Sequence, residues 1–150
     1  RAGRTLECIE VMKTLWCDDV SSYRGKYFSI DAAYQNPKPV QKPHIPILFG
    51  GESDPALLRV AQVGQGWYGF NLTPQLLEER LEHLVRLLDG QGRSIEEIRI
   101  CVGPATSVRS AADFERFQSL GVDQVVLPVM AAKKSSLEER AKKAFARVYG

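Results

Sequence analysis

The feature that most constrains the fold is an alternation of short apolar segments with helical segments after residue 44. Each apolar segment has the length of a strand, and apolar residues at helical spacing follow it. The expected strand and helix pairs are residues 45–49 with 55–63, 66–70 with 73–88, 98–102 with 111–120, and 124–129 with a final helix opening at Ser135 and Ser136. Strand and helix units in succession require a parallel sheet with crossover helices outside it.

The unbroken apolar character of two of these strands leaves two architectures within the α/β fold class. Residues 45–49 and 125–129 are apolar without alternation, which is typical of strands covered on both faces. A doubly wound open sheet meets this condition, and so does part of a (β/α)8 barrel, which takes about 250 residues when complete. The chain has 150 residues, the size of one domain, and periodicity alone leaves both architectures open.

The chain before residue 45 has a different pattern. Apolar residues recur at helical spacing over residues 5–16, which predicts an amphipathic helix. A short alternating run at residues 26–30 follows. Four prolines then fall close together, and we expect a long extended excursion there, of a kind that is often functional: Pro37, Pro39, Pro43 and Pro46.

Charge and cysteine content disfavour several classes of function. Lys and Arg number 20 against 18 Asp and Glu, and they are scattered, so neither nucleic acid nor a membrane surface is an expected partner. No apolar run has the length of a membrane span, and the first residues lack the core of a signal peptide, so we expect a cytoplasmic protein. Cys8, Cys17 and Cys101 lack CxxC spacing, which favours reduced structural thiols and no metal site.

The segment PILFGGESDP, residues 46–55, carries the clearest indication of a ligand. In both architectures ligands bind at the carboxyl ends of strands. Gly50 and Gly51 would let backbone N–H groups approach an anion, the helix start adds donors, and Ser53 adds a hydroxyl. Glu52 would repel a phosphate unless its carboxylate points elsewhere, to a sugar or ribityl hydroxyl or to a neighbouring Arg.

A structural interpretation of the same residues stays open. A glycine pair before a helix can be only a tight turn, and Ser53, Asp54 and Pro55 can be only a helix cap. Neither GxGxxG nor GxxxxGK[ST] occurs, so a Rossmann or P-loop site is not supported.

Other candidate residues carry weaker signals. His44 is either a general acid or substrate contact or, as we favour, a surface or packing residue. His83 is attributed to a solvated helix face. Trp67 and Tyr68 form either an aromatic platform for a planar ligand or core packing. No paired carboxylates and no GxSxG elbow suggest a catalytic group, so catalytic residues stay unassigned and reactivity is expected from a cofactor.

Several segments, taken in order, resemble the carboxyl-terminal half of the bacterial luciferase-like flavin and deazaflavin oxidoreductases. Residues 1–16 are similar to that family's helix before a long insertion. The other segments that carry the resemblance are YRGKYF at 23–28, PKPVQKPHIPI at 37–47, GGES at 50–53, GQGW at 64–67 and GVDQVVL at 121–127. Together these segments cover nearly the whole chain.

The resemblance implies that residues 1–150 are the carboxyl-terminal part of a single (β/α)8 TIM barrel domain, with four β/α units. It further implies that the phosphate-bearing tail of a cofactor lies against Gly50, Gly51, Glu52 and Ser53. The run at residues 66–74 resembles the subgroup that uses coenzyme F420, which we favour over FMN.

Two departures from the family pattern matter. Gln65 stands where the family usually has Asp, so an ion pair of that Asp is in doubt. The four leading strands are absent, and in the family they carry most of the isoalloxazine contacts, so no catalytic residue can be transferred to this chain.

The leading hypothesis is a fragment of an F420-dependent oxidoreductase that transfers hydride to a small organic substrate and is inactive as an isolated chain. The alternatives are an FMN-dependent monooxygenase of the same family, a non-catalytic half-barrel module, and an open flavodoxin-like domain. A barrel opened at four strands would expose two sheet edges and an apolar interior. We therefore expect a homo-oligomer, pairing with the missing barrel half, or aggregation.

Overall fold

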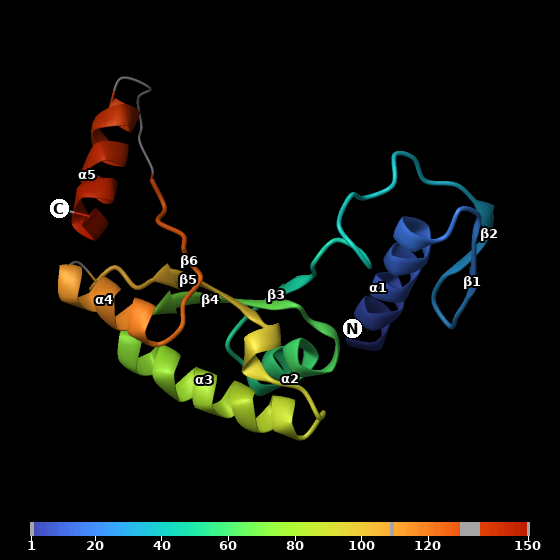
Figure 1. The fold of residues 1–150 in the computed structure, drawn as a ribbon, viewed down its shortest axis with the longest axis horizontal. Coiled ribbons are helices and arrows are strands. Elements are labelled where there is room, and N and C mark those ends of the chain that lie inside the picture. The colour runs from blue at the N-terminus through green and yellow to red at the C-terminus, as the bar shows by residue number, and fades with distance from the viewer. Residues whose placement is uncertain (1, 109, 130–135, 150) are drawn as a thin grey trace. The chain divides into compact units, whose positions relative to one another are not determined.

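The computed structural model describes residues 2–108, 110–129 and 136–149 (Figure 1). The chain divides into two compact units, Arg1–Pro46 and Ile47–Gly150. Among the described residues, no helix combines the length and the apolar character needed to cross a membrane.

The first unit consists of a helix and a β-hairpin. Helix α1 spans Ala2–Cys17, which confirms the helix expected at residues 5–16, and strands β1 (Ser21–Arg24) and β2 (Ser29–Ala33) pair antiparallel. The alternating run at residues 26–30 is largely the hairpin turn, because the Glu7 carboxylate accepts hydrogen bonds from the backbone there. Residues 34–47 form neither helix nor strand.

The second unit is an α/β structure with a parallel sheet. Its strands lie in chain order and all pair parallel: β3 (Leu48–Gly50), β4 (Gly66–Leu72), β5 (Arg99–Pro104) and β6 (Gln124–Val125). The helices are α2 (Asp54–Val63), α3 (Pro74–Asp89), the short 3-10 helix η1 (Ile95–Glu97), α4 (Ala111–Ser119) and α5 (Leu137–Tyr149). The expected parallel sheet is confirmed, and the helix start expected at Ser135 and Ser136 falls partly outside the described residues.

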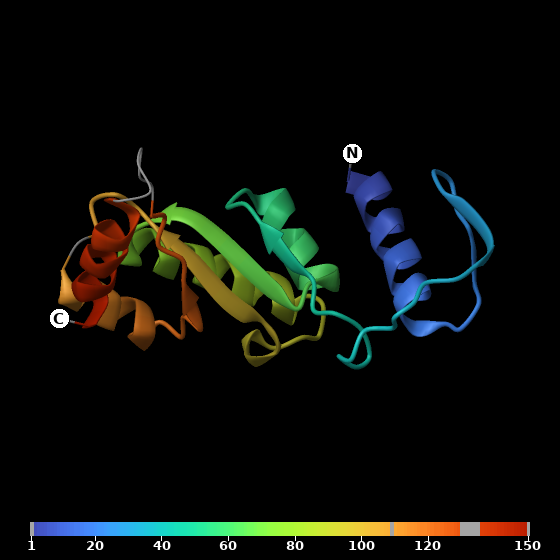
Figure 2. The same cartoon turned by 90° about the horizontal axis from the view of Figure 1, so that it is seen from above.

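Helices α2, α3 and α4 lie on one side of the sheet (Figure 1), and from above the strands pass in front of α3 (Figure 2). A doubly wound sheet carries helices on both faces, whereas sequential strands with helices outside are typical of a (β/α)8 barrel. The main core fills the space between these helices and the sheet; its fully buried members include Leu57, Val60, Trp67, Leu77, Leu84, Leu88, Val102 and Phe117.

The other face of the sheet is open among the described residues. Leu48, Phe70 and Val126 are 42%, 62% and 40% exposed, although each belongs to an apolar strand segment. Among the described residues only the helix side is covered, so the pattern of strands buried on both faces is met on one face, and the exposed apolar face agrees with the expected exposure of an opened barrel's interior. The last strand is also shorter than expected, because Pro104 and Pro128 lack the N–H groups that would extend its pairing.

Candidate functional site

The segment from Gly50 to Ser53 connects strand β3 to helix α2. Gly51 has a φ of +106°, a conformation that favours glycine, and a Cβ there would lie 3.2 Å from the Ala56 Cβ. Ser53 occupies the N-cap position, but its side chain makes no capping hydrogen bond. The interpretation as a tight turn is thus correct for Gly51, while the Ser53 hydroxyl makes no hydrogen bond among the described residues.

Backbone donors at this helix start also lack partners. Among the described residues, no hydrogen bond uses the N–H of Glu52, Ser53 or Asp54. Ser53 and Asp54 are exposed, so these donors lie next to solvent. N–H groups at a helix start, joined by a hydroxyl, suit a phosphate group, and this donor set fits the phosphate of a flavin-type cofactor.

The two carboxylates of the segment are engaged elsewhere. Glu52 Oε1 accepts a hydrogen bond of 2.6 Å from the backbone N–H of Phe70, at the end of the neighbouring strand β4. Asp54 Oδ1 lies 3.6 Å from Arg80 Nη1 and 3.3 Å from His83 Nε2, both on helix α3. The repulsion between the Glu52 carboxylate and a bound phosphate is therefore reduced. The partner of this carboxylate is a backbone N–H, and not the hydroxyl or Arg that we expected.

The aromatic residues of strand β4 divide between the two faces of the sheet. Trp67 is fully buried on the helix side, and its Nε1–H donates to the Gly51 carbonyl at 2.9 Å. Tyr68 and Phe70 lie on the open face with ring centroids 6.5 Å apart. Of the two alternatives left open for Trp67 and Tyr68, core packing is correct for Trp67, and a joint platform is excluded because adjacent strand residues point to opposite faces. The pair available to a planar ligand is Tyr68 and Phe70.

Gln65, which stands where the resemblance leads us to expect Asp, makes two hydrogen bonds with its side chain. Its Oε1 accepts from the backbone N–H of Ile47 at 3.0 Å, and its Nε2 donates to the Val63 carbonyl at 3.2 Å. An uncharged side chain thus links the start of β3 to the loop before β4.

The two histidines, His44 and His83, each lie against a neighbouring side chain. His44 lies in the first unit, where its ring is 6.2 Å from the Trp16 ring, which agrees with a packing role. His83 is only 28% exposed, and its buried Nε2 has no aligned hydrogen-bond partner among the described residues. The assignment of His83 to a solvated helix face is therefore wrong, because the helix turns it toward Asp54.

No disulfide links the described cysteines. Cys8, Cys17 and Cys101 are all free thiols, as expected, and Cys101 is buried. Burial raises the pKa of the Cys101 thiol, and the nearby Arg99 opposes that rise only partly. A thiol with a raised pKa is a poor nucleophile, so Cys101 is a structural residue.

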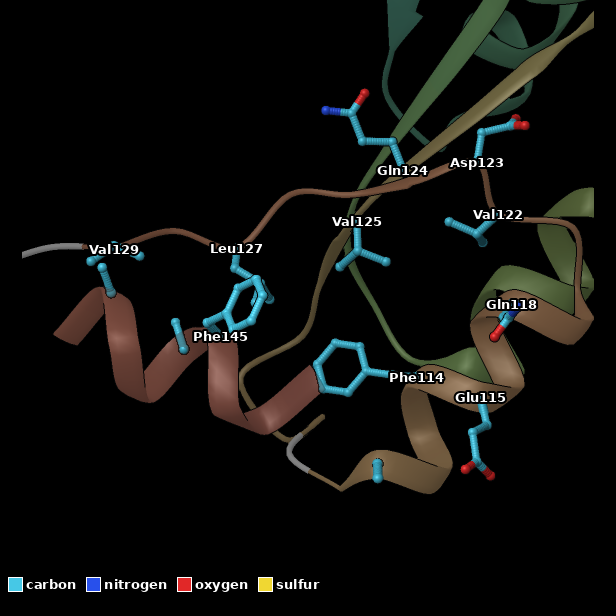
Figure 3. A pocket seen from close by; sticks show the side chains of 13 residues that line it. Phe114, Glu115, Gln118, Val122, Asp123, Gln124, Val125, Leu127, Val129 and Phe145 are labelled. Atoms are coloured by element: carbon cyan, nitrogen blue, oxygen red, sulfur yellow. The ribbon is translucent and has the colours of Figure 1, made fainter. Parts of the chain in front are cut away.

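A cavity of about 670 Å³ lies beside strand β6, between helices α4 and α5 (Figure 3). Its walls are largely apolar, and the side chains of Phe114, Val125, Leu127 and Phe145 line it. Asp123, at its edge, accepts a hydrogen bond from the backbone N–H of Ile100 at 2.6 Å. This cavity belongs to the helix side of the sheet, and residues 50–53 do not line it.

The sequence model of the family described as luciferase-like monooxygenase matches residues 1–147. The chain belongs to this family. An uncharacterised protein of Mycobacterium tuberculosis is 33% identical over 94 residues, which is 63% of this chain and 32% of that protein. The FMNH2-dependent dimethylsulfone monooxygenase of Pseudomonas putida is 34% identical over 71 residues, 47% of this chain and 19% of that enzyme.

A solved F420-dependent secondary alcohol dehydrogenase, in complex with an F420-acetone adduct, shares the fold. The TM-score is 0.72 at 14% identity, and the match covers 96% of this chain and 61% of that one. The matched part spans about a third of the length of the mycobacterial relatives. The α/β structure is consistent with a fragment of a luciferase-like TIM barrel, and relatives in this family include oxidoreductases and monooxygenases that use F420 or FMN.

Proposed function

We propose that this chain is part of an F420-dependent oxidoreductase in which residues 50–53 hold the phosphate-bearing tail of the cofactor. The observation that carries the proposal is the unused donor set at the start of helix α2, on Glu52, Ser53 and Asp54. When bound, the reduced deazaflavin supplies a hydride to a small organic substrate.

The chain's own residues would bind and orient this cofactor. The N–H groups after Gly51 and the Ser53 hydroxyl would hold the phosphate, while the open face of strand β4 presents Tyr68 and Phe70 to a planar ring. Apolar side chains on that face would exclude water from the reacting ring. Catalytic residues remain unassigned.

A second candidate is an FMN-dependent monooxygenase with the same phosphate site. The FMNH2-dependent relative from Pseudomonas putida favours it, at 34% identity over 71 residues. Titration of the full-length protein with F420 and with FMN, followed by fluorescence, separates the two. Saturable binding of F420 alone supports the first candidate, binding of FMN alone supports the second, and binding of neither by folded protein overturns both.

The role of residues 50–53 is best tested at Gly50. A substitution of Gly51 would strain the backbone by itself, whereas a Cβ at Gly50 would meet only the Tyr68 carbonyl, at 3.9 Å. We expect Gly50→Ala to weaken cofactor binding about tenfold by keeping the phosphate at a distance. Gly90→Ala is the matched control, because a Cβ at exposed Gly90 has only ordinary contacts, the closest at 3.5 Å. Equal cofactor affinity in the two variants would contradict this role.

A further inference from the structure

Several carbonyl and carboxylate oxygens of the loop that joins β3 to α2 accept hydrogen bonds from neighbouring residues. The Gly51 carbonyl accepts from Trp67 Nε1 at 2.9 Å, and the Ser53 carbonyl accepts from the N–H groups of Ala56 and Leu57 at 2.8 and 3.0 Å. Glu52 Oε1 is bound by Phe70. Oxygens that would repel an anion are thereby hydrogen-bonded. The Gly51 N–H donates to the Tyr68 carbonyl at 3.4 Å, whereas the N–H groups of Glu52, Ser53 and Asp54 find no acceptor among the described residues.

Arg80, which lies outside the loop, contacts two further oxygens. Its Nη1 lies 3.4 Å from the Glu52 carbonyl oxygen and 3.6 Å from Asp54 Oδ1. Arg80 sits on α3, the next helix along the chain, and its side chain is 36% exposed against 74% for Asp54. One guanidinium therefore contacts the loop backbone at Glu52 and offsets the Asp54 carboxylate at the helix start.

We propose that Arg80 is a positioning residue for the anion loop, and that it raises the affinity for the cofactor's phosphate without contacting the phosphate. This inference rests on the proposed function. Without Arg80, the Asp54 carboxylate is left beside the unused N–H groups of its own helix start. It can then accept from them and compete with the phosphate, and the Glu52 carbonyl loses its donor.

The test compares FMN with riboflavin, which differ by the phosphate alone, in the full-length protein. If the protein binds only F420, the pair is F420 and the same deazaflavin without its phosphate-bearing tail. We expect Arg80→Met to reduce the preference for the phosphate-bearing member about fivefold, as befits a half-exposed ion pair, and to leave the affinity for the other member unchanged. Arg86→Met is the matched control, because Arg86 is an exposed residue of the same helix and makes no hydrogen bond or ion pair to the loop among the described residues.

Two further variants distinguish positioning from a loss of folding. Arg80→Lys keeps the positive charge and should retain part of the preference. Asp54→Asn combined with Arg80→Met removes both charges and should restore most of the preference for the phosphate-bearing member. A protein that has lost its fold would not regain that preference.

The possible outcomes separate this inference from the proposed function. Wild-type protein that binds both members of the pair equally would overturn the phosphate site and the inference together. A wild-type preference that survives unchanged in folded Arg80→Met would overturn the inference alone.

Discussion

At the scale of single residues, Trp67 connects the core to the candidate site. Its ring is fully buried between the sheet and the helices, and its Nε1–H reaches the carbonyl of Gly51. The same side chain therefore fills the core and fixes the glycine turn. The glycines that flank Trp67 in the sequence indicate neither role.

Trp67→Phe separates these two roles. The smaller ring keeps most of the packing but leaves the Gly51 carbonyl without its donor, so we expect a loss of about 1–3 kcal/mol in the free energy of unfolding. Denaturant unfolding followed by circular dichroism measures it. Trp16→Phe serves as the control, since Trp16 is half-buried and its ring nitrogen donates no hydrogen bond among the described residues. A Trp67→Phe protein as stable as wild type would show that the hydrogen bond does not matter.

At the scale of elements, Glu7 joins helix α1 to the β1–β2 hairpin. Its carboxylate accepts backbone hydrogen bonds from Lys26, Tyr27 and Phe28 at 3.0, 2.7 and 2.7 Å. Any side chain on Gly25 would overlap this carboxylate. Desolvation opposes ionisation of Glu7, yet the three hydrogen bonds outweigh it and lower the pKa of Glu7 below its ordinary value of 4.5.

This shift makes the stability of the first unit depend on pH. Because the folded pKa of Glu7 is depressed, its contribution is present above the ordinary value of 4.5 and is lost as the pH falls through the folded pKa. We expect Glu7→Gln to lower the unfolding midpoint at pH 7 and to reduce the loss of stability on acidification. Thermal unfolding of both proteins over an acidic pH series measures this.

Glu10→Gln provides the control for that series. Glu10 is an exposed residue of the same helix, and its pairing with Lys13 at 3.2 Å is a surface ion pair of small effect. Identical pH profiles for the Glu7 and Glu10 variants would contradict a special role of Glu7.

At the scale of the whole molecule, one face of the parallel sheet leaves apolar side chains exposed among the described residues. Exposed apolar side chains on a sheet face, with unpaired strand edges beside them, favour association. We propose that this face is covered by a second copy or by the other barrel half. Phe70 is its most exposed large side chain, at 62%.

The mass of the 150-residue chain in solution tests this proposal. We expect a dimer or a larger species by light scattering, and a shift toward monomer in Phe70→Lys. Leu76→Lys is the control, because it removes an apolar side chain that is 45% exposed on helix α3 instead of the open face. A wild-type chain that is a stable monomer would contradict coverage by a second copy and leave the other barrel half as the cover.

The order of the parallel strands and their helices, the family and the position of the glycine turn could all be predicted from the sequence. These features are encoded in local periodicity, caps and short motifs; Thr73, for example, caps α3 as its position before Pro74 indicates. Helix bounds agree with the prediction within a few residues for the same reason.

Which side chains contact one another across helices and strands depends on the tertiary structure. Arg80 reaches Asp54 and Glu52 because the crossover from α2 through β4 brings α3 alongside α2, and no local pattern contains that contact. The face of the sheet on which Trp67 lies was likewise undetermined, because strand register and helix packing depend on residues far apart in the chain. The loop oxygens and their donors are therefore a property of the fold, assembled from segments that the sequence keeps separate.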